Sequence, residues 1–215
     1  MTEKFLKLTP EKQQQILRAM CEEFTEHSYE DASTNRIVEK AGISKGTLFN
    51  YFGCKEEMYH ALLRYVLELL KGYAIDDFET SDFIERCRIL AELDLKIYRE
   101  SPYMINFFAR IYVGKGTHIP DDITETIGIL LSEAMERLYA NVDYSLFRTD
   151  VDTTLMMKMI RFTFDGYIQE VIGKMQMEEL TADMLEALMD DYDVFLKGME
   201  TIYYRKLERG CEDAD

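Results

Sequence analysis

The segment that decides the fold runs from Ser33 to Lys55 and reads STNRIVEKAGISKGTLFNYFGCK. It predicts two short helices joined by a tight turn. Ser33 and Thr34 can cap the first helix, and Gly42 follows it where the chain must turn sharply. The apolar positions of this first helix fall on one face: Ile37, Val38 and Ala41.

The second helix is expected to begin at Ser44, a residue suited to cap it. Unpaired backbone N–H groups and the positive end of the helix dipole then project from the start of this helix, where they suit a phosphate or a base edge. Leu48 and Phe52 are four residues apart and should face the core. Four other side chains are left to point outward: Lys45, Thr47, Asn50 and Tyr51.

These residues carry a resemblance to a known family. Thr-x-x-Ile from residue 34, followed by Ala-Gly-Ile-Ser-Lys-Gly-Thr-Leu-Phe-x-Tyr-Phe-x-x-Lys-Glu-Glu from residue 41, resembles the DNA-binding head of the TetR (tetracycline-repressor) family. The match spans Thr9 to Leu70, with Val38 where the family usually has alanine. The resemblance implies an all-α fold with an N-terminal three-helix helix-turn-helix head and a larger C-terminal helical domain for ligand binding and dimerisation.

The resemblance also implies roles for individual residues of the head. Lys45, Gly46, Thr47 and Phe49 would lie against base edges, and a glycine at position 46 lets the helix approach closely. Simple surface exposure is the alternative for each residue, and core packing is the alternative for Phe49. The expected DNA-binding set is Thr34, Arg36, Ser44, Lys45, Gly46, Thr47, Phe49, Asn50, Tyr51 and Lys55, with Thr34, Tyr51 and Lys55 as phosphate contacts.

The charge of the chain is unevenly distributed. The whole chain of 215 residues carries a formal net charge of −16, which argues against nucleic-acid binding when taken alone. Between Thr34 and Lys55, however, four bases face a single acid, which gives a net charge of +3 on the segment expected to touch DNA. The acidic remainder either discourages non-specific binding or serves only solubility.

The composition fits long helices around a sizeable core, because 47% of the residues are hydrophobic and only 3 are proline. The cysteines are far apart and form no Cys-x-x-Cys pair, so neither disulfides nor zinc are expected. No apolar run reaches the roughly 18 residues of a membrane span, and no secretory leader is recognisable. We therefore expect a soluble, cytoplasmic protein without cofactor or metal.

The apolar periodicity divides the chain into an expected head, 1–55, a linking helix, 56–71, and a body, 72–215. Pro102 should end one body helix, and Pro120 should open another. A turn is expected at Gly114-Lys115-Gly116. The helix from Leu155 to Met175 is apolar over much of its circumference and must be covered on more than one side. We therefore expect the last two helices to form a four-helix homodimer interface, which the resemblance also implies.

The body is rich in methionine and aromatic residues, for which core filling is the first explanation. Collectively they could also line a cavity for a small hydrophobic or aromatic effector, as the resemblance implies. The candidate pocket residues are Tyr98, Tyr103, Met104, Phe107, Phe108, Tyr112, Met156, Met159, Phe162 and Tyr167. Any of four acids that faced the cavity would add a preference for a cation: Asp94, Glu100, Asp165 and Glu170.

These patterns together predict a ligand-responsive transcriptional regulator, most often a repressor in families of this kind. It would bind a palindromic double-stranded DNA operator as a homodimer, with its recognition helices about 34 Å apart, and an effector would release it. A helical ligand-binding or adaptor protein that no longer reads DNA is the alternative. An enzyme is disfavoured, because the three histidines have no metal-ligand spacing and no catalytic motif occurs.

Overall fold

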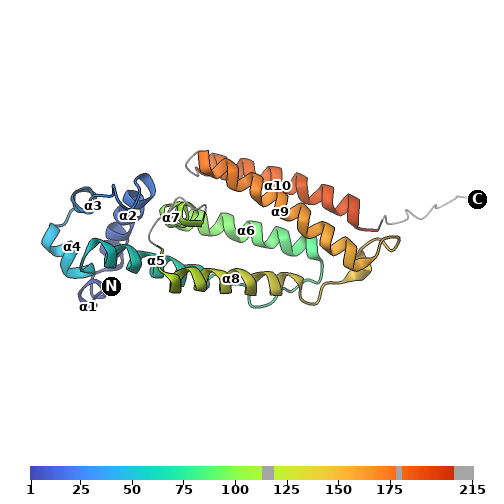
Figure 1. Ribbon diagram of the computed structural model, residues 1–215, viewed down its shortest axis with the longest axis horizontal. Helices are drawn as coiled ribbons and strands as arrows, with labels where there is room; N and C mark the ends of the chain where they lie inside the picture. Colours follow the sequence, from blue (N-terminus) through green and yellow to red (C-terminus); the bar gives the residue numbers. More distant parts are fainter. Residues whose placement is uncertain (113–118, 178–180, 206–215) are drawn as a thin grey trace, which may run out of the picture.

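The computed structural model describes residues 1–112, 119–177 and 181–205. In this part of the chain the regular secondary structure is helical, apart from one isolated bridge between Phe147 and Tyr204, and loops join the helices. This confirms the predicted all-α fold. The first five helices lie at one end of an elongated molecule, and the long body helices occupy the rest (Figure 1). The helices are α1 (Glu3–Leu6), α2 (Pro10–Glu26), α3 (Thr34–Ala41), α4 (Lys45–Phe52), α5 (Lys55–Lys71), α6 (Phe83–Glu100), α7 (Pro102–Tyr112), α8 (Asp121–Tyr139), the 3-10 turn η1 (Tyr144–Leu146), α9 (Thr153–Met177) and α10 (Ala182–Tyr203).

The ends of the head helices follow the sequence signals closely. Thr9 caps α2 by accepting a hydrogen bond from the Lys12 amide, and Ser44 caps α4 by accepting one from the Thr47 amide at 3.0 Å. Gly42 ends α3 with a φ of +60°, a left-handed conformation that favours glycine. The expected side-chain cap of α3 is wrong, because Ser33 is the N-cap residue but its side chain makes no capping hydrogen bond.

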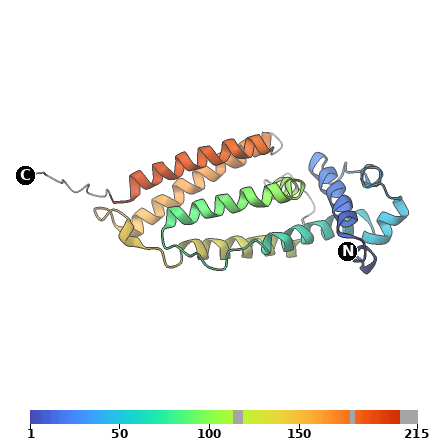
Figure 2. The ribbon, with the colours of Figure 1, turned by 180° about the vertical axis from the view of Figure 1, so that it is seen from behind.

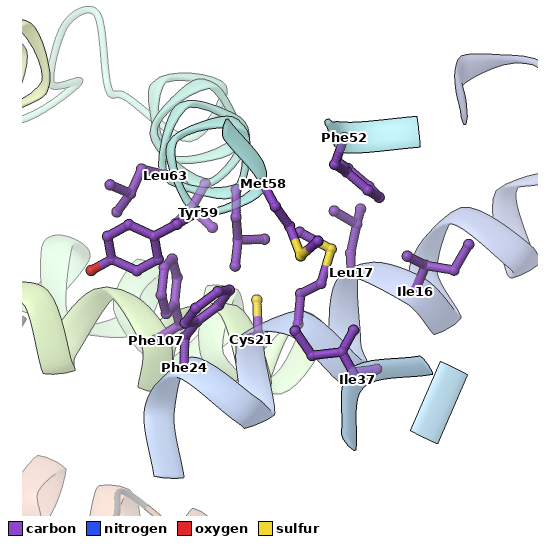
Figure 3. Packing of buried hydrophobic residues seen from close by; sticks show 14 of the residues in the cluster. Ile16, Leu17, Cys21, Phe24, Ile37, Phe52, Met58, Tyr59, Leu63 and Phe107 are labelled. Carbon is purple, nitrogen blue, oxygen red and sulfur yellow. The ribbon is translucent and has the colours of Figure 1, made fainter. Parts of the chain in front are cut away.

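The head is built around one apolar core. Its buried side chains come from α2, α3, α4 and α5, with Ile37 and Phe52 carried by the two short helices (Figure 3). Leu48 and Phe52 are buried, as the four-residue spacing predicts. This core fixes the angle between α3 and α4, and it leaves the start of α4 outside.

The head core does not end at the linking helix α5. Helix α7 packs along α2 and inserts Phe107 between the head rings, 5.9 Å from the Tyr59 ring centroid (Figure 3). Met104 and Ile111 of the same helix are buried in the same cluster. A break in the chain between α5 and α6 is present where the polar run predicts it, but the head core continues across that break into the body.

The body forms a second, separate core. In two opposite views α6 lies between α8 on one side and the pair α9 and α10 on the other (Figures 1 and 2). Phe83, Phe147 and Leu196 are among the fully buried side chains that join these helices. The proline predictions hold: α6 ends at Glu100 and α7 begins at Pro102, and Pro120 is the N-cap residue of α8. The turn expected at residues 114–116 lies outside the described residues.

A buried arginine ties α6 to the end of α8. Only 3% of Arg86 is exposed, and its guanidinium donates to the carbonyl oxygens of Thr80 at 2.7 Å and Leu138 at 3.0 Å, and also to that of Ala140. The guanidinium carbon also lies 5.1 Å from the Phe78 ring centroid. No carboxylate pairs with Arg86 among the described residues, so the negative end of the α8 dipole supplies its counter-charge.

No helix in the described ranges is long and apolar enough to cross a membrane. Within the same ranges, no group of three or more histidine, cysteine, aspartate or glutamate side chains could hold a metal ion.

Candidate nucleic-acid interface

The start of α4 presents a small polar surface. Lys45 and Gly46 are exposed, while Thr47 is half-buried with its Oγ1 atom 2.8 Å from Ser44 Oγ. The Ser44 hydroxyl group accepts a hydrogen bond from the Thr47 amide. The amides that precede Thr47 in α4 have no acceptor within the helix, so they stay available to an acceptor outside the protein. This arrangement is suited to binding a phosphate or a base edge.

Gly46 is not required by the fold. A Cβ atom added there would meet only Ser44 Oγ, at an ordinary 3.9 Å, and the residue lies in regular helix. A glycine inside a helix costs about 1 kcal/mol relative to alanine. No packing inside the protein requires a glycine at position 46. A glycine there is useful only if another molecule must approach the backbone of α4 closely at this point.

Lys45 is the free cation of this surface. Its Nζ atom lies 6.0 Å from the Phe49 ring centroid, and it makes no ion pair with any described residue. Phe49 itself is half-buried, and its contact with a base edge stays a prediction. The aromatic face supports the lysine without neutralising its charge.

Lys55 is held in place at the start of α5. Its Nζ atom donates to the Glu30 carbonyl oxygen at 3.0 Å and lies 5.0 Å from the Tyr29 ring centroid. Neither contact removes the positive charge, and the amide end of α5 adds to it. Lys55 can therefore still bind a phosphate.

The remaining expected contacts lie around α4 in varied settings. Thr34 is the first residue of α3 and half-buried, and Tyr51 packs its ring against Phe5 at 5.9 Å. Asn50 is exposed, and its Oδ1 atom accepts a hydrogen bond from Lys4 Nζ at 2.9 Å. Lys4 was missed from the sequence, because the four-residue helix α1 that places it beside α4 is too short for an apolar period.

Arg36 is paired within the head. Its guanidinium grips the fully buried carboxylate of Glu23, with Nη2 at 2.6 Å and Nε at 2.9 Å from Oε1, and it also donates to the Asp31 carbonyl oxygen. The Ser33 amide donates to the same carboxylate at 2.6 Å. Arg36 therefore links α3 to α2, and its contact with DNA stays a prediction. Lys40 is likewise paired, with Glu26 at 3.1 Å, so the free charge of the segment is smaller than its formal +3.

We expect Glu23→Gln to lower the free energy of unfolding at pH 7 by about 2 kcal/mol, because the charge of the buried partner in a half-exposed ion pair is removed. Burial raises the pKa of Glu23, but the Arg36 and Ser33 hydrogen bonds outweigh it and leave the pKa below its usual range. A lowered folded pKa stabilises the protein above the unfolded pKa, and this stability is lost as the pH falls.

The measurement is thermal unfolding of wild type and variant at pH 7 and at successively lower pH, where the difference between them should shrink. Glu26→Gln removes a half-exposed surface pair on the same helix and should cost about 0.5 kcal/mol or less. A Glu23→Gln deficit that stayed the same in acid would contradict the ionic explanation.

The expected pocket residues lie in different parts of the described chain. Met104 and Phe107 are buried in the head core, with Tyr103 and Phe108 packed against it, whereas Met156 is buried in the body core. This burial fits the alternative explanation, core filling, and the pocket role of these residues stays a prediction.

Met159 and Phe162, two further pocket candidates, are 45% and 55% exposed, and their role in a pocket stays a prediction. Tyr98 is buried in α6, and Tyr167 stacks on Phe195 at 4.4 Å. The side chain of Tyr112 lies outside the described residues.

The body nevertheless has an open apolar groove between α8 and α9. It was not expected from the sequence, where Leu131 and Met135 continue the apolar period of α8 and look like core residues. The groove is lined by Leu131, Ser132, Met135, Glu136, Tyr139, Met157, Lys158 and Arg161.

The α3–turn–α4 unit, with its capped and exposed second helix, defines a helix-turn-helix protein. Residues 16–62 match the family described as bacterial regulatory proteins, tetR family. These residues therefore form a DNA-binding head of the TetR type, and the chain is similar to transcriptional regulators of this family.

Relatives of known role agree with this assignment. The transcriptional repressor AcnR of Corynebacterium glutamicum is 26% identical over 196 residues, which cover 84% of this chain and 93% of the repressor. The transcriptional regulator RutR of Escherichia coli is 28% identical over 126 residues, covering 57% of this chain and 58% of that protein.

A solved structure shares the fold. A TetR-family transcriptional regulator from Chloroflexus aurantiacus superposes with a TM-score of 0.62 at 20% identity, covering 95% of this chain and 99% of that one. The likeness includes the body as well as the head, although the matched family description covers the head alone.

Proposed function

We propose that this regulator is a homodimeric repressor that binds a palindromic operator through the start of α4 and is released by a small hydrophobic effector. In this proposal residues 1–55 read DNA, residues 56–71 link, and residues 72–215 bind the effector and dimerise. The observation that carries the proposal is the start of α4. Free backbone amides, the lysine Lys45 without an ion pair to a described residue, and Gly46, which no packing inside the protein requires, occur together there. Repression is inferred from the repressor AcnR, with which the chain aligns over most of both lengths.

The proposed DNA contacts divide into two kinds. Lys45, Gly46 and Thr47 would lie in the major groove and contribute to sequence preference, with Ser44 and Phe49 shaping the helix start. Thr34, Tyr51 and Lys55 would bind phosphates and set the orientation. Asn50 is a candidate base reader whose amide must first leave Lys4.

Selection of bound fragments from random duplex DNA, at 0.1 M salt, tests the proposal directly. A palindromic sequence with half-sites about one helical turn apart should be enriched. No enrichment would favour the alternative, a ligand-binding or adaptor protein that no longer reads DNA.

Lys55→Ala is expected to weaken binding of the selected and of random duplexes alike. Because each dimer would lose one phosphate contact per subunit, the slope of log affinity against log salt should fall in magnitude by about two. Fluorescence anisotropy over a salt series measures this. Lys7→Ala, which removes the exposed lysine that follows α1 and pairs with Glu3, is the control. A loss confined to the selected sequence would contradict a phosphate role.

The outer faces of α9 and α10 support the proposed homodimer. Leu155, Met159 and Phe162 of α9 are about half exposed, and they recur at the four- and three-residue spacing of one helix face. On α10, Val194 is 69% exposed. Beyond Phe162, Gly166 has open space where a Cβ would point, which would let a partner helix approach closely.

We expect Phe162→Glu to raise the dimer dissociation constant by a factor of about 100 or more, since two copies of a central apolar side chain become charged. Sedimentation equilibrium measures this. Ile129→Glu, which charges a similarly exposed apolar residue of α8, should leave the dimer intact. A variant at position 162 that stayed dimeric at the wild-type dissociation constant would place the interface elsewhere.

The effector would act through the body. An effector that binds better to a dimer with misplaced heads lowers DNA affinity through its differential affinity for the two states. The apolar groove between α8 and α9 supports a hydrophobic ligand, and FadR of Bacillus subtilis, which shares the fold at 17% identity and a TM-score of 0.51, was solved in complex with stearoyl-CoA.

A further inference from the structure

The short helix α1 packs against the end of α4 (Figure 1). Thr2 donates its backbone N–H group to the Tyr51 carbonyl oxygen at 3.0 Å and its hydroxyl group to the Asn50 carbonyl oxygen at 3.4 Å. The ring of Phe5 is fully buried, with its centroid 4.9 Å from that of Phe52. The last carbonyl groups of a helix have no donor within it, so Thr2 supplies donors that α4 lacks. Helix α1 therefore holds the C-terminal end of α4 in place.

This packing places the Lys4 side chain beside Asn50. The Nζ atom of Lys4 donates a hydrogen bond to Asn50 Oδ1 at 2.9 Å. An amide oxygen is neutral, so Lys4 keeps its positive charge. Asn50 is exposed, and its amide NH2 group donates no hydrogen bond to any residue in the described ranges. Asn50 therefore presents its donors to the outside while Lys4 occupies its acceptor.

The atom that Lys4 occupies decides which base edge Asn50 reads. In the major groove adenine presents the N6–H donor beside the N7 acceptor, and asparagine contacts both by using its amide oxygen and its amide nitrogen. Guanine presents two acceptors, O6 and N7, which pair with donors alone. To read adenine with both atoms Asn50 must leave Lys4. A donor contact with guanine keeps the Lys4 hydrogen bond, and the adjacent positive charge favours an edge with acceptors only.

We propose that Lys4 is a positioning residue for DNA recognition: by holding the Asn50 oxygen it makes Asn50 a reader of guanine rather than of adenine. The inference rests on the proposed function, in which Asn50 contacts a base. Leaving Lys4 would cost Asn50 a charge-assisted hydrogen bond, which is stronger than a neutral one. This cost lowers the preference for adenine in each half-site. It leaves the position of α4 unchanged, because Thr2 and Phe5 hold α1 there independently of the Lys4 side chain.

The test compares the sequences that wild type and Lys4→Met select from random duplex DNA at 0.1 M salt. Wild type should favour guanine over adenine by about tenfold at one position of each half-site. Lys4→Met should shift this ratio toward adenine by about tenfold or more, because methionine donates no hydrogen bond and frees the Asn50 oxygen. Lys4→Arg keeps a charged donor and should retain guanine. A melting temperature within about 2 °C of wild type establishes that each variant is folded.

Lys7→Met is the matched control. It removes the same charge from the residue that follows α1, where Lys7 pairs with Glu3 and not with Asn50. It should leave the selected bases unchanged. In an Asn50→Ala background, Lys4→Met should also leave them unchanged, because the amide group through which Lys4 acts is absent.

Three results would overturn the inference: the same selected bases for wild type and Lys4→Met, an equal shift for Lys7→Met, or a shift that persists in the Asn50→Ala background. Selection by wild type alone measures the proposed function. If wild type enriched no duplex, the proposed function would fail and this inference with it. If wild type enriched a palindrome that Lys4→Met enriched unchanged, the inference alone would fail.

Discussion

Lys45→Glu is expected to reduce affinity for the selected operator by a factor of about 100 or more, because in the proposed dimer each subunit would lose a base or phosphate contact and gain a repulsive charge. The structure predicts little effect on folding. Lys45 is exposed, makes no ion pair with a described residue and contacts only the Phe49 ring. The loss should therefore be visible in anisotropy titrations while the melting temperature stays within about 2 °C of wild type.

Lys96→Glu is the matched control for this experiment. Lys96 is exposed on the outer face of α6, in the body, and the substitution makes the same change in total charge. If net charge alone governed DNA binding in this acidic chain, the two variants would lose affinity equally. A much smaller loss for Lys96→Glu would locate the effect at the start of α4.

Arg86→Met is expected to lower the free energy of unfolding by about 3 kcal/mol, a value typical of removing one side of a buried charged network. Methionine fills a similar volume but donates no hydrogen bond. The carbonyl oxygens of Thr80, Leu138 and Ala140 would then lose their shared donor, and the C-terminal end of α8 would lose its counter-charge. Urea unfolding followed by circular dichroism measures the difference.

Arg88→Met provides the comparison, because Arg88 lies two residues further along α6 and pairs with Glu85, Asp193 and Glu200. Its side chain is 30% exposed, so water replaces much of what the substitution removes. We expect a loss of about 1 kcal/mol or less. Equal losses at the two positions would mean that the hydrogen bonds of Arg86 to the carbonyl oxygens stabilise the protein no more than the partly exposed ion pairs of Arg88.

The sequence is informative where the signal is local. The helix starts after Thr9 and Ser44, the turn at Gly42 and the change of direction at Pro102 depend on backbone chemistry within a few residues, and all are present as predicted. The short helix α1 is absent from the prediction, because one turn of helix has no period to detect.

Charges and cavities were harder to predict, because they depend on contacts between distant segments. Arg36 looks like a free base until α2 brings Glu23, thirteen residues earlier in the chain, against it. Apolar periodicity gives the same pattern for a core side chain and for a groove side chain. Hence Met104 and Met135 were indistinguishable in sequence, although one is buried and the other is 43% exposed beside a groove.

The insertion of Phe107 among the head rings means that the DNA-reading unit is not a detachable module. A fragment that stopped at residue 71 would leave Phe24 and Tyr59 facing water on the side that α7 now covers. A rotation of α7 would also displace α2, because the two helices share one close-packed core in which side chains cannot shift independently. The aromatic rings that stabilise the head are therefore also the contacts through which a movement of α7 would reach it, and no separate pathway of residues is required.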